Sequence, residues 1–92
     1  MIRNAKDIAE TLAAIRRAFG DGPDMTRAKW AARHSFNYTQ YANWETGARR
    51  IPIEAADVLC DRYGLTLDFV YRDRRDGLSA AAMKALAEHL DR

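Results

Sequence analysis

The apolar positions of the chain recur with the spacing of amphipathic helices. The clearest series is Ile8, Leu12, Ile15 and Phe19, which follow one another at intervals of four, three and four residues. A helix with about 3.6 residues per turn brings such positions onto one face, so the series predicts a helix from near Asn4 to Phe19. The glycine- and proline-containing run that follows would end this helix.

Two shorter helices are predicted next. Thr26 is a competent N-cap for one helix, and after a short break Asn37 can cap another. The apolar side chains Tyr41 and Trp44 would face inward from the third helix. Gly47 would end it, because glycine readily adopts the left-handed conformation found after a helix.

Three further helices are predicted in the second half of the chain. Pro52 opens the fourth, because a missing N–H costs nothing in a first helical turn. Thr66 can cap a short fifth helix that reaches Tyr71, and Ser79 can cap a last helix to about Leu90, beyond a charged linker. The expected buried side chains of the fourth helix are Ile53, Ala56, Leu59, Cys60 and Tyr63, and the last helix carries Met83, Leu86 and Leu90 in one apolar stripe. The predicted fold class is therefore all-α, a compact bundle of about five helices plus a C-terminal helix.

Composition limits the class of protein further. A chain of 92 residues, of which 48% are hydrophobic and 30% charged, can form one domain with a modest core. No apolar run approaches the roughly 18 residues of a membrane span, and the first residues lack the apolar stretch of a signal peptide. Cys60 is the only cysteine, so no internal disulfide is expected, and a reducing cytoplasm suits the chain.

Basic residues are concentrated in the middle of the chain. Between Thr26 and Arg50 there are five basic residues and one acid, Glu45, whereas residues 51–92 contain six basic residues and eight acids. The middle segment is therefore electropositive, as binding to a phosphate backbone requires. An ordinary solvated surface would show the same charges, so the charge alone does not decide between these two interpretations.

The second and third predicted helices suggest a specific mode of binding. Because only a few residues separate them, we expect them to cross at a large angle, so that the third helix protrudes from the body. In a helix-turn-helix, the protruding helix lies in the major groove of DNA. Its outward positions carry polar, uncharged side chains that can bond to bases or phosphates, namely Tyr38, Thr39, Gln40 and Asn43.

Residues 25–47 resemble the helix-turn-helix of Cro and lambda-type repressors, also called the XRE family, and the similarity extends over roughly residues 8–71. Its most specific part consists of Ala31, the aromatic Tyr41, the series Trp44-Glu45-x-Gly47, and Pro52. The resemblance implies a lambda repressor-like DNA-binding domain over residues 1–71. Residues 72–92 would be a charged linker and a C-terminal helix, which would serve either as a dimerisation element or as a helix folded back on the core.

The resemblance also implies roles for individual residues. The base-reading positions of the family correspond to Tyr38, Thr39, Asn43 and, nearer the DNA backbone, Gln40. The phosphate-contacting positions correspond to Thr26, Arg27, Asn37, Arg49 and Arg50. Glu45 matches a glutamate that pairs with an arginine of the first helix, for which Arg16 is the best match. That pair would be structural and would hold the first helix to the third.

The chain departs from the family pattern at several places. Ser35 stands in the turn where the family usually has glycine, and Ile53 stands before the fourth helix where serine is usual. The segment from Gly20 to Asp24 adds about four residues between the first two helices, which makes the alignment of Arg16 less direct.

No catalytic or metal-binding arrangement is apparent. His34 and His89 are far apart and lack cysteines or paired carboxylates at ligand spacing, so we expect no metal. No Ser-His-Asp set, Cys-His pair or glycine-rich phosphate loop is assembled, so we expect neither an enzyme nor a bound cofactor.

The sequence predicts a sequence-specific regulator of transcription that binds double-stranded DNA. One reading helix covers only a few base pairs, so we expect a homodimer on a palindromic operator, acting as a repressor. Two alternatives stay open: an antitoxin that also binds its own operator, and a protein-interaction module that has lost DNA binding. A toxin or an anti-repressor would be the protein partner in such cases. We expect a bacterial or phage-encoded cytoplasmic protein, nucleoid-associated when bound to DNA, with no membrane partner.

Overall fold

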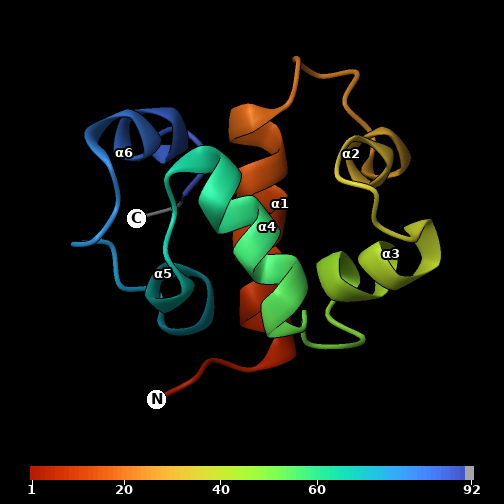
Figure 1. Cartoon of the computed structure of the whole chain (residues 1–92), viewed down its shortest axis with the longest axis horizontal. Coiled ribbons are helices and arrows are strands. Elements are labelled where there is room, and N and C mark those ends of the chain that lie inside the picture. The colour runs from red at the N-terminus through yellow and green to blue at the C-terminus, as the bar shows by residue number, and fades with distance from the viewer. Residues whose placement is uncertain (91–92) are drawn as a thin grey trace.

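The computed structural model describes residues 1–90, and these residues form six helices and no strand (Figure 1). In chain order the helices are α1 (Ala5–Phe19), α2 (Arg27–Arg33), α3 (Tyr38–Thr46), α4 (Ile53–Tyr63), α5 (Leu67–Arg72) and α6 (Ala80–Leu86). The predicted fold class, an all-α bundle with an additional C-terminal helix, is confirmed. The number of helices and their order along the chain also agree with the apolar periodicity.

The long helix α1 is the element against which most of the others pack. It contacts α3, α5 and α6, while α2 packs on α3 and α4 packs on α5. Figure 1 shows α2 and α3 on one side of α1 and α4, with α5 and α6 on the other side. The α2–α3 pair therefore forms one flank of the molecule, and its position depends on the contacts of α3 with α1.

Five of the six helices begin at a polar side chain that accepts a hydrogen bond from a backbone N–H of the first turn. These N-caps are Asn4, Thr26, Asn37, Thr66 and Ser79 for α1, α2, α3, α5 and α6. Helix α4 begins after Pro52 without a side-chain cap. Such caps satisfy N–H groups that have no partner within the helix, and each contributes about 1 kcal/mol.

The turn between α2 and α3 contains no glycine, although one of its residues has a backbone conformation that glycine favours. Ser35 has a φ of 60°, in the left-handed region that L-residues rarely occupy. Backbone hydrogen bonds close the turn: Ser35 N–H donates to Ala32 O at 3.1 Å and Phe36 N–H to Ala31 O at 2.8 Å. Ser35 therefore holds a backbone conformation that glycine adopts more readily.

One residue predicted to be buried is exposed. Ile53 is 61% exposed, so that prediction was wrong. Ile53 is the first residue of α4, where the helix has not yet reached the core, and Ala55 takes the inner position. Met83 of the expected stripe in the last helix is 42% exposed, next to the buried Ala82.

The last helix is also shorter than predicted. Helix α6 ends at Leu86 rather than near Leu90, and residues 87–89 form turns. Leu86 is fully buried, and α6 packs against α1. Helix α6 is therefore folded back on the core.

A buried histidine connects α2 to α4 within a group of aromatic rings. His34 Nδ1 lies 2.8 Å from Trp30 O, and its Nε2 lies 2.7 Å from the hydroxyl of Tyr63. A ring nitrogen facing a carbonyl oxygen must carry the proton, so Nε2 accepts from the Tyr63 hydroxyl. Burial lowers the pKa of His34, and the positive charges of Arg62 and Arg33 lower it further, whereas the bond to Trp30 O opposes them. The folded protein therefore favours neutral His34.

This lowered pKa predicts a loss of stability in mild acid. The unfolded chain, in which histidine has its ordinary pKa of 6.5, takes up the proton first as the pH falls. The contribution of neutral His34 is thus fully present above pH 6.5 and is lost as the pH falls from there towards the lower pKa of the folded state. Urea denaturation between neutral pH and pH 5 should show this decline for the wild type. His34→Gln should flatten it and His89→Gln should not; an equal decline in both variants would contradict the assignment.

Candidate nucleic-acid interface

Helix α3 is held in place by the buried carboxylate of Glu45. The Glu45 side chain is 0% exposed and forms an ion pair with Arg16 of α1, whose Nη2 donates to Oε1 at 2.7 Å. The Nε of Arg16 donates to Oε2 at 3.0 Å, and the Tyr41 hydroxyl donates to the same oxygen at 2.6 Å. Arg27 of α2 donates from Nε to Oε1 at 3.1 Å. One carboxylate therefore joins α1, α2 and α3.

Burial and mutual contacts together set the ionisation states of Glu45, Arg16 and Tyr41. Burial alone would raise the pKa of Glu45, but the hydrogen bonds from Arg16 and Tyr41 and the charge of Arg16 outweigh it and lower that pKa. The hydrogen bond to Glu45 raises the pKa of Arg16. Burial, together with the neighbouring carboxylate, raises the pKa of Tyr41, which stays a neutral donor. Glu45 is thus ionised in the folded protein, and its two oxygens accept from three side chains.

Removing this carboxylate should therefore destabilise the fold. Glu45→Gln keeps the size of the side chain but leaves Arg16, whose side chain is only 14% exposed, without its counter-charge. We expect a loss of about 3 kcal/mol in the free energy of unfolding, since breaking a buried ion pair leaves an uncompensated charge. Urea denaturation at neutral pH measures this loss. Glu54→Gln on the exposed first turn of α4 is the matched control and should change little; equal stabilities of the two variants would contradict a structural role for Glu45.

The outward side of α3 is polar and uncharged. Tyr38 is 52% exposed, Thr39 and Gln40 are exposed, and Asn43 is half-buried. Glu45 is the only acid between residues 25 and 53, and it is buried, so no carboxylate lies on the exposed surface of this part of the chain. The polar side chains exposed there are amides, hydroxyls and cations.

The structure brings together some of the predicted site residues around one depression of about 490 Å³. Its lining consists of Gln40, Asn43, Trp44, Arg49, Arg50 and Pro52. Two of the four predicted base-reading residues thus lie beside both arginines of the loop after α3. Tyr38 and Thr39 do not line the depression.

The predicted phosphate contacts differ in how far their side chains are already engaged. Thr26 and Asn37 use a side-chain oxygen to cap α2 and α3, and Arg27 is bound to Glu45 with its side chain still 42% exposed. Arg50 donates from Nη2 to Arg3 O at 3.2 Å. Within residues 1–90, neither Arg49 nor Arg50 forms an ion pair, so the charges of these two arginines are the least compensated of the predicted set.

Sequence reasoning missed the support beneath this loop. The Tyr71 hydroxyl donates to Ile51 O at 2.6 Å, and Arg3 N–H donates to Tyr71 O at 2.7 Å. The Arg3 guanidinium donates from Nη2 to Val70 O and to the Thr11 hydroxyl, each at 2.8 Å. The N-terminal segment therefore fastens α5 to α1 and to the loop that carries Arg50. Apolar periodicity contains no signal for such contacts between distant residues.

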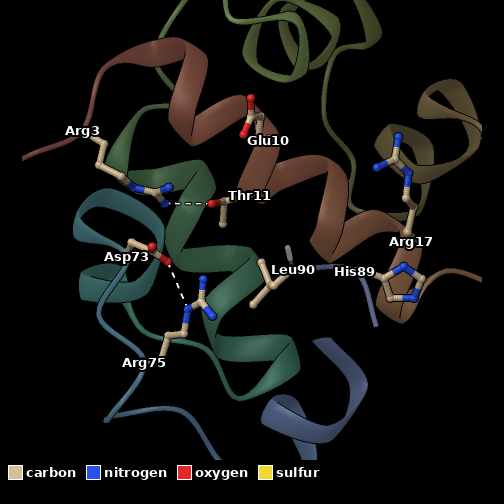
Figure 2. A pocket seen from close by; sticks show the side chains of 8 residues that line it. All are labelled: Arg3, Glu10, Thr11, Arg17, Asp73, Arg75, His89 and Leu90. Carbon is tan, nitrogen blue, oxygen red and sulfur yellow. Dashed lines mark hydrogen bonds and ion pairs between the residues drawn. The ribbon is translucent and has the colours of Figure 1, made fainter. Parts of the chain in front are cut away.

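A second polar cavity lies away from the predicted site. It has a volume of about 450 Å³ and lies between α1, the segment after α5 and the turn after α6 (Figure 2). Figure 2 shows Asp73 bonded to Arg75 and Arg3 bonded to Thr11, so much of its polar lining is internally paired. None of the residues predicted to contact DNA lines this cavity.

Searches for other kinds of site and for relatives gave negative results. In residues 1–90, no three or more His, Cys, Asp or Glu side chains are grouped as a metal site would require. None of the six helices has the length and apolar character needed to cross a membrane. Comparisons with models of protein families, with curated proteins and with solved structures found no match.

Proposed function

We propose that this chain is a sequence-specific regulator of transcription that binds duplex DNA through α3 and the loop at residues 48–51. The observation that carries the proposal is the composition of this surface. It joins the amides of Gln40 and Asn43 to the uncompensated charges of Arg49 and Arg50, while the only acid of the region is buried. A surface of this kind attracts phosphates and offers donors and acceptors to bases.

The local architecture supports a helix-turn-helix. Helix α2 is followed, after the four residues 34–37, by α3, which packs its aromatic side on the core and leaves its polar side exposed. The resemblance of residues 25–47 to the Cro and lambda-type repressors supports the same interpretation. In this proposal, α3 lies in the major groove and the loop after it lies against the phosphate backbone.

The side chains divide between two tasks. Gln40 and Asn43 each present a donor and an acceptor that match the major-groove edge of adenine, and Tyr38 and Thr39 contact bases or a thymine methyl group. Arg49 and Arg50 neutralise phosphates and release counterions, which makes the affinity depend on salt. Because binding over a promoter is sufficient to block it, repression is the simplest activity. A repressor of this kind acts where the DNA is, in the cytoplasm.

Selection from a library of randomised duplexes tests this proposal. We expect the wild type to enrich one sequence motif, and Asn43→Ala to lose discrimination at one position of that motif, at a cost of about 1–3 kcal/mol. Arg49→Ala should weaken binding similarly to all duplexes and reduce the salt slope by about one counterion. Fluorescence anisotropy across a salt series measures both effects.

The matched control is Lys84→Ala, which removes a cation from α6, on the other side of the molecule. It should bind the selected duplex almost as tightly as the wild type does. Three results would refute the proposal: no enriched motif, affinity that does not change with salt, or equal losses in Lys84→Ala and Arg49→Ala.

A further inference from the structure

The first turn of α1 lies directly against the residue that ends α3. Gly47 follows the last residue of α3 and has a φ of 86°, in the left-handed region that glycine adopts readily. A Cβ atom at this position would lie 3.0 Å from Cγ and 3.1 Å from Cα of Lys6. Carbon atoms in contact are normally about 3.5–4.0 Å apart, so glycine at this position is what lets the Lys6 side chain lie so close to the end of α3.

The same turn of α1 adjoins the loop that carries the two arginines without ion pairs. Arg50 donates from Nη2 to Arg3 O at 3.2 Å, and Arg49 N–H donates to Asn43 O at 3.0 Å. Figure 1 shows the start of α1 beside the connection between α3 and α4. Lys6 therefore lies at the edge of the surface that α3 and this loop form.

The charge of Lys6 has no partner within the part of the chain that the structure describes. The residue is exposed, and no ion pair in residues 1–90 includes it. Asp7 and Glu10 belong to the same helix, but neither is paired with Lys6, and Glu10 lines the cavity of Figure 2. Lysine has a compact cation on a flexible stem of four carbons, so its ammonium group can reach a phosphate beside the helix.

We infer that Lys6 binds a phosphate of duplex DNA, so that the first turn of α1 is a third part of the interface, beside α3 and the loop after it. The inference rests on the proposed function and adds a residue to the same surface. Together with Arg49 and Arg50, Lys6 would form a group of cations around Gly47.

A phosphate contact from α1 would serve to orient the protein rather than to select a sequence. Such contacts fix the position of a protein on the duplex and carry no sequence information themselves. Helix α1 packs against α3, so a contact from α1 connects the reading helix to the DNA backbone through a second rigid element. Lys6 would thus limit the angles at which α3 can enter the major groove.

Fluorescence anisotropy at 50 and 200 mM salt, with the selected duplex and with a scrambled one, tests this contact. Lys6→Gln should bind both duplexes more weakly than the wild type does at 50 mM. Loss of one phosphate contact reduces the salt slope by about 0.9, so the ratio of wild-type to variant affinity should fall about 3.5-fold between the two salt concentrations. The sequence motif that Lys6→Gln enriches should be that of the wild type, because phosphates are common to all sequences.

Two variants serve as controls. Lys6→Arg keeps the charge and should retain the salt slope of the wild type. Arg17→Gln removes one charge from the last turn of the same helix, at an exposed position that also forms no ion pair, and should leave the slope unchanged. Circular dichroism establishes that each variant is folded before its affinity is measured.

The possible failures of this inference and of the proposed function can be told apart. An unchanged salt slope in Lys6→Gln, while the wild type binds, would overturn the inference and leave the proposed function intact. Equal changes in Lys6→Gln and Arg17→Gln would also overturn it, because net charge would then explain the effect. A reduced slope on every duplex without an enriched motif would support the Lys6 contact and refute only sequence-specific regulation. A wild type that binds no duplex at low salt would refute both.

Discussion

The arrangement of the first three helices depends on the buried carboxylate of Glu45. Its oxygens accept from Arg16 of α1, Arg27 of α2 and Tyr41 of α3 itself, with donor–acceptor distances of 2.6–3.1 Å. A carboxylate without these partners would be too costly to bury in its charged form. The same contacts also remove the only negative charge of residues 25–53 from the surface. One interaction therefore both positions α3 and leaves its surroundings cationic.

Much of the fold could be predicted because its signals are local. The caps Thr26, Asn37, Thr66 and Ser79 act within three residues of their own positions, so the sequence alone indicates where those helices begin. Predictions failed at helix ends. A periodic pattern does not show whether the first residue of a helix has reached the core, and the exposed Ile53 is the example.

The candidate site could be predicted only in part, because its geometry depends on distant contacts. The outward residues of α3 follow from helical spacing once Tyr41 and Trp44 are placed inside. The position of the loop that carries Arg50 does not follow from helical spacing, because this loop is supported by the Tyr71 hydroxyl and by Arg3. These contacts join residues separated by twenty or more positions, and no pattern in the sequence specifies them.

We propose that duplex DNA binds to the polar side of α3 and the loop after it. Titration of the isotopically labelled protein with duplex DNA, followed by the backbone amide shifts of residues 1–90, tests this claim most directly. We expect the largest shift changes to fall on residues 38–43 and 48–50 and to diminish as salt is added. Changes confined to the cavity of Figure 2, or no changes at low salt, would contradict it.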